Sequence, residues 1–300
     1  MSRLSANILL LLAAALWGAG NVSQKTILDH LGPFTAVALR CLIGAVVVLP
    51  FCWREFIDQR GGAGRRSWWP ALTIAILFTL AIALQQCAYG STSVTNASIL
   101  VNTTVVMTPL AGWLLLGERP ALMVALAATV AFAGAYLLGG GSPASLQPGD
   151  LICLASAAVY SIWIIVVGVW ARLGDAGSVI PQFLAAGLVC GLLGVALEPI
   201  SLQMLQAALP DLIVLGVMAT GAPYAIQALA QRYTPANDAA VVMSAEGVFG
   251  AAAGGLMLGE RLGPVETCGA IIILISVGLV QVPGYWPFAA RAVPQSEDSR

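Results

Sequence analysis

Charged residues are scarce in this chain, and histidine is almost absent. Asp, Glu, Lys and Arg make up only 9% of the 300 residues, against about 25% in a soluble domain. The single histidine, His30, stands in a turn beside Gly32 and Pro33, so we expect a loop residue rather than a catalytic base. The 13 basic residues nearly balance the 14 acidic ones, which leaves no basic field for nucleic acid. Histidine-based catalysis and nucleic-acid binding are therefore not expected.

Cysteines are isolated, and the short motifs of common enzymes are missing. The six cysteines stand singly in apolar runs with no CxxC pair, so the sequence predicts neither a metal centre nor a redox site. It contains no GxxxxGK[ST], which argues against an ATP-driven mechanism within this chain, and no HExxH or GxSxG. We therefore predict a protein that is not an enzyme and that binds no cofactor and no metal.

Apolar residues, in contrast, are abundant. They make up 59% of the chain, and the mean hydropathy is +0.90. About ten apolar runs are long enough to cross roughly 30 Å of hydrocarbon as helices. These runs cover residues 6–28, 34–53, 69–89, 93–115, 121–139, 150–170, 178–197, 211–232, 236–258 and 264–283. The composition thus predicts an all-α membrane protein with ten transmembrane helices, surrounded by lipid.

The basic residues predict the orientation of these spans. If the N-terminus is cytoplasmic, ten basic residues lie at inner ends and three at or near outer ends, as the positive-inside rule requires. The inner set is Arg3, Arg54, Arg60, Arg65, Arg66, Arg119, Arg172, Arg232, Arg291 and Arg300, and the outer set is Lys25, Arg40 and Arg261. Both termini are then cytoplasmic, in a multi-pass protein of the inner (plasma) membrane, and residues 284–300 form a disordered tail.

The sequence repeats itself. An offset of 142 residues brings the Leu-Gly-Glu-Arg segment at 116–119 onto that at 258–261, Gln85 onto Gln227 and Thr92 onto Thr234, and an offset of 143 pairs Trp17 with Tyr160. The halves, 6–139 and 150–283, each hold five spans, and an odd number places the second half upside down in the bilayer. Inverted repeats are typical of carriers that bind substrate near the midplane, although duplicated bundles also serve as channels, receptors and scaffolds.

Three motifs resemble a known family. They are Ala15-Leu16-Trp17-Gly18 in the first span, Ala38-Leu39-Arg40 in the second, and the two Leu-Gly-Glu-Arg segments. The chain is similar through them to EamA domains of the drug/metabolite transporter superfamily, and as a whole it resembles the YddG-type exporters of aromatic and neutral amino acids. The resemblance implies ten helices with both ends cytoplasmic, and metabolite export. The second half departs from the pattern, because Gln182-Phe183 stands where Arg40 predicts an arginine and Tyr160 replaces the tryptophan.

Polar and large aromatic residues within the spans are the candidate site. An unpaired polar group in hydrocarbon costs several kcal/mol, so such side chains usually face the bundle interior or a wet cavity. The predicted substrate-binding or cavity residues are Trp17, Asn21, Gln24, Lys25, Arg40, Phe78, Gln85, Tyr89, Asn102, Tyr160, Trp163, Tyr224, Gln227, Ser244 and Glu246.

Several of these residues have a specific expected role. Tyr160 and Trp163 would stack on a flat apolar substrate, unless they only pack. Arg40 would hold a substrate carboxylate together with Lys25, or serve a structural pairing. Glu246 is the one carboxylate placed near the bilayer centre, which suggests a site for a proton or an ammonium group, or else a buried neutral acid.

The leading hypothesis is a secondary exporter of neutral or aromatic amino acids and related small metabolites that works by alternating access. A drug/metabolite or nucleotide-sugar carrier of the same fold is the near alternative, and a membrane scaffold or receptor is the second. The sequence leaves open the exact substrate, the direction, the choice between proton coupling and facilitated exchange, and the oligomeric state, with which a monomer is compatible.

Overall fold

The computed structural model describes residues 1–61, 69–92, 97, 100–117, 119–141, 147–172, 179–258 and 262–279. The predicted tail 284–300 lies outside these residues. So do Arg65, Arg66, Arg261, Arg291 and Arg300 of the sets used to predict orientation.

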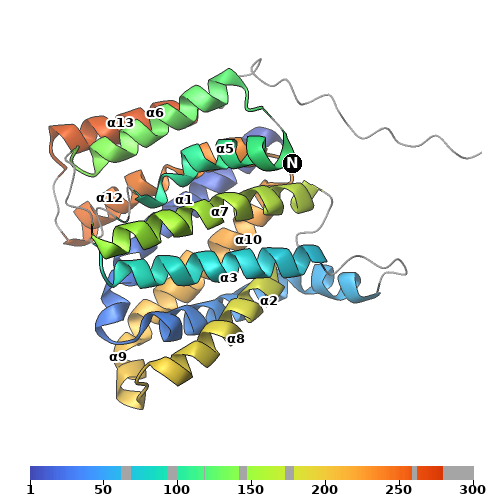
Figure 1. The fold of residues 1–300 in the computed structure, drawn as a ribbon, viewed down its shortest axis with the longest axis vertical. Coiled ribbons are helices and arrows are strands. Elements are labelled where there is room, and N and C mark those ends of the chain that lie inside the picture. The colour runs from blue at the N-terminus through green and yellow to red at the C-terminus, as the bar shows by residue number, and fades with distance from the viewer. Residues whose placement is uncertain are drawn as a thin grey trace, which may run out of the picture.

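Every regular element in the described residues is a helix (Figure 1), which confirms the all-α class. The first half contains α1 (Arg3–Thr26), the 3-10 turn η1 (Ile27–Asp29), α2 (Pro33–Gly61), α3 (Trp69–Tyr89), α5 (Thr104–Leu116) and α6 (Leu122–Leu138). The second half contains α7 (Pro148–Arg172), α8 (Val179–Leu197), α9 (Leu202–Ile213), the π-helical η2 (Val214–Gly221), α10 (Ala222–Ala230), α11 (Ala236–Met243), α12 (Glu246–Leu258) and α13 (Pro264–Leu279).

Six helical stretches are long and apolar enough to cross a membrane. They are Arg3–Asp29, Pro33–Pro50, Trp69–Tyr89, Pro148–Ala171, Val179–Leu197 and Leu202–Ala230. Three shorter helices, α5, α6 and α13, are also apolar. The chain is therefore a multi-pass membrane protein, while the count of ten spans and the side on which the termini lie stay predictions.

Two of the predicted spans are interrupted. The chain turns at Asn102 and Thr103 before α5, and again at Ser244 and Ala245 between α11 and α12. The turns are 142 residues apart, so they occupy the same place in each repeat. Near each turn a hydroxyl bonds a carbonyl three residues back: Ser244 donates to Val241 at 2.7 Å, and Thr103 donates to Leu100 at 2.6 Å. Such local bonds compete with the helical pattern.

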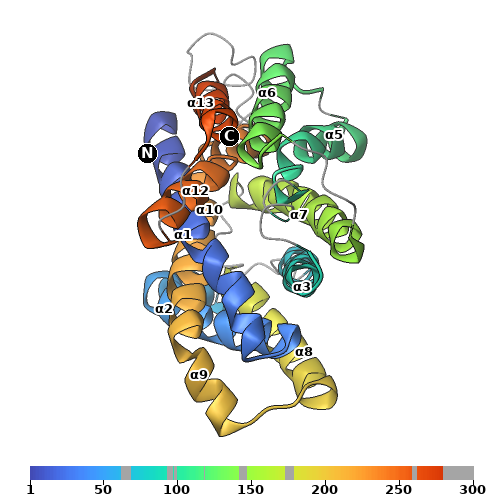
Figure 2. The same ribbon diagram turned by 90° about the vertical axis from the view of Figure 1, so that its left-hand side faces the viewer.

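Corresponding helices of the two halves pack against each other. Figure 1 shows α6 beside α13 at one end of the molecule, and α2 contacts α8 toward the other end. Between these pairs, α3 lies against α7, while α1 runs along α12 and α10 (Figure 2). Each helix of the interior thus has its neighbours mainly in the opposite repeat, which places a boundary between the halves at the centre.

Glycine allows the closest of these approaches. A Cβ built on Gly269 of α13 would lie 2.6 Å from the carbonyl oxygen of Gly134 on α6, and one on Gly18 of α1 would lie 2.6 Å from the carbonyl oxygen of Glu246. Small residues at such crossings let helix backbones pack tightly where lipid offers no hydrophobic driving force.

Two substitutions on α13 test this packing. We expect Gly269→Ala to lower the melting temperature in detergent, because the added methyl meets the backbone of α6. Gly278→Ala is the matched control, since a Cβ there meets nothing within 4 Å and alanine favours a helix over glycine by about 1 kcal/mol. Equal melting temperatures for the two variants would contradict the tight crossing.

The repeat is also visible in individual contacts. The hydroxyl of Thr234 donates to Asn7 at 2.8 Å, and the hydroxyl of Thr92 donates to the carboxylate of Asp150. Thr92 and Thr234 are equivalent by the 142-residue offset, and Asn7 and Asp150 by the 143-residue offset. The same pair of positions therefore meets twice, once at the start of α1 and once at the start of α7.

Candidate functional site

A cavity of about 620 Å³, open space at its mouth included, lies between the halves. Helices of both repeats line it, and so do residues at or next to the two helix interruptions. Eleven of the fifteen predicted site residues come together here, namely Trp17, Gln24, Arg40, Gln85, Asn102, Tyr160, Trp163, Tyr224, Gln227, Ser244 and Glu246.

A chain of hydrogen bonds links the acidic and basic residues of the cavity. The amide nitrogen of Asn21 donates to the carboxylate of Glu246 at 3.0 Å, and that of Gln24 donates to the Asn21 oxygen at 2.9 Å. The guanidinium of Arg40 donates to the Gln24 oxygen at 3.3 Å. We call these four residues the polar chain. Its two ends are an acidic and a basic side chain.

Arg40 is held by protein groups on several sides. It is 2% exposed, its Nε donates to the hydroxyl of Thr220 at 2.9 Å, and its Nη1 also donates to the Gln86 side-chain oxygen at 3.3 Å. Gln86 donates in turn to the backbone carbonyl of Gln24 at 2.9 Å. Buried charges are stable only when such partners replace water. Arg40 therefore faces the cavity from a fixed position.

Lys25 occupies a different place from the one predicted. Its ammonium donates to the backbone carbonyls of Tyr89 at 2.5 Å and Thr92 at 3.2 Å, at the C-terminal end of α3, where a cation is favourable. It is absent from the cavity wall. A joint grip by Arg40 and Lys25 on one substrate carboxylate is therefore not what the structure shows.

Three other predicted residues lie behind the wall rather than on it. Tyr89 is 1% exposed and packs with Ala97 and Cys153. Asn21 lies within the polar chain, and Phe78 supports the aromatic side chains described next. Phe78, Gln85 and Tyr89 lie at helical spacing on one face of α3, and this face passes from the cavity into the core along the helix.

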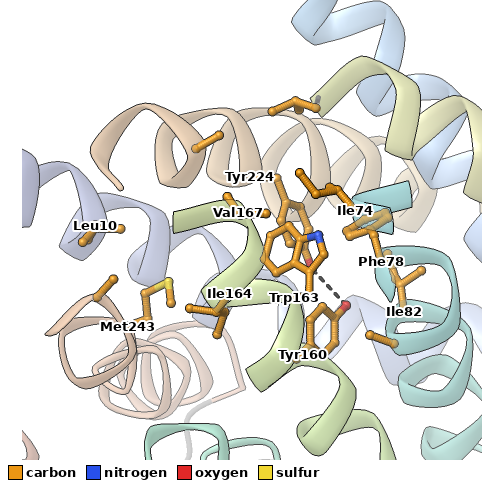
Figure 3. Close-up of a cluster of buried hydrophobic side chains, with 14 of the residues drawn as sticks. Leu10, Ile74, Phe78, Ile82, Tyr160, Trp163, Ile164, Val167, Tyr224 and Met243 are labelled. Carbon is orange, nitrogen blue, oxygen red and sulfur yellow. Dashed lines mark hydrogen bonds between the residues drawn. The ribbon is translucent and has the colours of Figure 1, made fainter. Parts of the chain in front are cut away.

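Aromatic side chains also line the cavity, namely those of Trp17, Tyr160, Trp163 and Tyr224. Figure 3 shows Phe78, Tyr160, Trp163 and Tyr224 close together, contributed by α3, α7 and α10. Tyr224 is central: its ring lies 5.0 Å from that of Trp17, 5.0 Å from Phe78 and 5.5 Å from Trp163, all with steep interplanar angles. These edge-to-face pairs, at about 4.5–7 Å, are favourable. We call Trp17, Phe78, Tyr160, Trp163, Phe183 and Tyr224 the aromatic cluster.

Hydrogen bonds fix the polar edges of this cluster. The Tyr160 and Tyr224 hydroxyls are 3.0 Å apart, and Tyr160 donates to the Gln85 oxygen at 3.3 Å. The indole of Trp163 donates to the Gln182 oxygen at 3.0 Å. Gln182, like Gln86, was absent from the predicted site, although a glutamine inside an apolar run is the signal that identified the others.

The two halves differ at equivalent positions. Arg40 corresponds to Phe183 and Thr220 to Phe78 by the repeat offsets. Arg40 bonds Thr220 at 2.9 Å, and in the mirrored place the rings of Phe183 and Phe78 pack at 5.5 Å. One pair of positions is thus polar in one half of the interface and aromatic in the other.

The interrupted helices bring backbone and carboxylate groups to the cavity. Asn102 and Ser244 line it at the turns, and Glu246, which is half-buried, begins α12. The N-terminus of a helix stabilises a negative charge. Irregular backbone within a membrane protein is typical of places that line a binding cavity. The described residues hold no group of three His, Cys, Asp or Glu side chains suited to a metal ion.

A cavity between two inverted helical repeats, with broken helices at its wall, is characteristic of membrane transporters. The model of the EamA-like transporter family matches residues 4–140 and 147–282. The chain belongs to this family and is a membrane transporter.

Individual relatives agree with this assignment. An uncharacterized transporter of Archaeoglobus fulgidus is 28% identical over 289 residues, which cover 94% of this chain and 87% of the relative. A protein of known crystal structure has the same fold, with a TM-score of 0.77 and 17% identity over 93% of this chain and 97% of that one.

Proposed function

We propose that this transporter carries neutral amino acids, with aromatic ones as the leading substrates, by alternating access through the cavity between its repeats. The observation that supports the proposal most directly is the pairing of a charged but balanced side, Arg40 and Glu246, with the aromatic cluster. A zwitterion with a flat apolar side chain matches both sides. The resemblance to amino-acid exporters supports the outward direction.

The same charges weigh against the near alternative. A nucleotide sugar brings a diphosphate, which is recognised by clusters of basic groups. Arg40 is the one basic residue on the cavity wall among the residues that the structure describes, and its guanidinium already bonds Thr220, Gln24 and Gln86. A cationic drug is the stronger competitor, because Glu246 faces an aromatic-lined space and cations are attracted to aromatic faces.

The placement in the membrane belongs to the same proposal. Ten spans, with both termini cytoplasmic in the inner membrane, agree with the distribution of basic residues. In this arrangement α5, α6 and α13 cross the membrane although each is shorter than 18 residues, with α5 and α12 completing the broken spans.

Counterflow in proteoliposomes tests the function. Vesicles loaded with unlabelled phenylalanine are expected to accumulate external labelled phenylalanine, and vesicles without protein are the control. Labelled tetraphenylphosphonium and a labelled nucleotide sugar should show no accumulation above that control. If no neutral amino acid exchanges, or if only the cation does, the proposal is wrong.

A further inference from the structure

Two buried polar atoms of the cavity have no hydrogen-bond partner among the described residues. They are Nε1 of the Trp17 indole and Oε1 of the Gln227 side chain. Gln227 is 1% exposed, Trp17 is half-buried, and both line the cavity. A buried polar group without a partner lowers stability, so such groups call for an explanation. One is a pure donor and the other a pure acceptor.

The orientation of the Gln227 amide follows from its neighbours. Gln231 donates through Nε2 to the backbone carbonyl of Ile164 at 3.1 Å, so its own oxygen points toward Gln227. Gln227 donates its Nε2 to that oxygen at 3.4 Å. A backbone carbonyl can only accept, so the bond to Ile164 determines which end of the Gln231 amide is the nitrogen. The Gln231 oxygen in turn determines the orientation of the Gln227 amide. It leaves Oε1 of Gln227, a residue of the cavity wall, as the atom that can still accept a hydrogen bond.

The repeat gives these two atoms a mirrored counterpart. Trp17 corresponds to Tyr160 and Gln227 to Gln85. In the counterpart the hydroxyl of Tyr160 donates to Oε1 of Gln85 at 3.3 Å. The same donor and acceptor positions are thus joined in one half and separate in the other, within one cavity.

We propose that the separated pair is the subsite for the polar end of the solute, where the Trp17 indole donates to its carboxylate and the Gln227 oxygen accepts from its ammonium group. This proposal rests on the transport of neutral amino acids. The ring of Trp17 lies 5.0 Å from Tyr224, so a carboxylate at Nε1 leaves the solute side chain beside the aromatic cluster. Arg40 and Glu246 then balance the field around the zwitterion, while the neutral pair makes the direct contacts.

The test removes one group from the protein and the matching group from the solute. Phenylalanine is compared with 3-phenylpropionate, which lacks the ammonium, and phenethylamine, which lacks the carboxylate, as competitors of labelled phenylalanine on the purified protein. A hydrogen bond to a charged group corresponds to about tenfold or more in affinity. We expect Gln227→Met and Trp17→Phe each to weaken phenylalanine binding by about this factor.

The decisive result is that removing a group from the protein has little further effect once the matching group has been removed from the solute. Gln227→Met should leave 3-phenylpropionate binding as in the wild type, because this solute lacks the ammonium that the lost oxygen contacts. Trp17→Phe keeps a ring in the aromatic cluster and should weaken the binding of phenethylamine, which lacks the carboxylate, far less than that of phenylalanine. Trp113→Phe on α5 and Gln203→Met on α9 make the same chemical changes at exposed positions outside the cavity. These controls should bind all three solutes unchanged.

Further variants and outcomes keep the proposal testable. Gln227→Glu retains an acceptor and adds a charge, so it should bind phenethylamine more tightly than the wild type does. If each substitution weakened the binding of both analogues as much as that of phenylalanine, in a protein that exchanges phenylalanine, the proposed subsite would be wrong and the transport function would stand. Absence of exchange of any neutral amino acid by the wild type would instead remove the function and the subsite together.

Discussion

Arg40→Leu is expected to reduce counterflow to background and to lower the melting temperature strongly. The guanidinium makes hydrogen bonds to Thr220, Gln24 and Gln86, and each bond to a charged group contributes about 1.5–3 kcal/mol. Total stability is only about 5–15 kcal/mol for a typical domain. Melting temperature in detergent and counterflow are the two measurements.

A paired variant separates the structural role of Arg40 from its transport role. In the mirrored half these positions hold Phe183 and Phe78, whose rings pack. We expect the double variant Arg40→Phe/Thr220→Phe to melt at a higher temperature than Arg40→Phe alone, while counterflow stays at background. Recovery of transport together with stability would show that the charge has no part in handling the solute.

Glu246→Gln is expected to fold and yet to lower phenylalanine counterflow at least tenfold, about 1.4 kcal/mol. The glutamine oxygen can still accept from Asn21, which donates to the carboxylate at 3.0 Å, so the polar chain is kept. The cavity, however, loses its acidic charge and retains Arg40, and a net positive site disfavours a solute ammonium. Thermal melting should therefore change little.

The change in selectivity is the sharper measurement on Glu246. Relative to phenylalanine, the anion 3-phenylpropionate should compete better in Glu246→Gln than in the wild type, because the field now favours negative charge. Asp211→Asn is a matched control, since this carboxylate accepts from Thr26 at 2.9 Å in an exposed pair outside the cavity. Unchanged selectivity in Glu246→Gln would contradict a role for its charge.

The helices could be predicted largely because apolar length and turn residues determine them. The predicted runs 69–89 and 178–197 correspond closely to α3 (Trp69–Tyr89) and α8 (Val179–Leu197). The predicted run 211–232 begins too late, because a continuous helical stretch starts at Leu202. Its first turns contain glutamines and end near Pro210, and hydropathy therefore assigned them to a connection.

The interruptions at Asn102 and Ser244 could not be found in this way. Apolar residues continue on both sides of each turn, so hydropathy sees one span, whereas the break depends on hydroxyl groups that bond the backbone. The site was predictable as a set of polar residues at helix interiors, but not as a geometry. Lys25 shows why. Its position on α1 next to Gln24 agrees with a place in the cavity, but the packing of α3 against α1 brings the carbonyls of Tyr89 and Thr92 to its ammonium group.

The duplicated contacts also bear on the proposed alternating access, which needs a second conformation besides the one in Figure 1. The hydrogen bonds of Thr92 with Asp150 and of Thr234 with Asn7 are both present in the structure. A conformational change that exchanges the roles of the two repeats would therefore leave both bonds intact. Tyr160 with Gln85 is made while Trp17 with Gln227 is not. If the protein works by alternating access, as proposed above, exchanging the roles of the repeats would give a state in which Trp17 and Gln227 join and Tyr160 leaves Gln85.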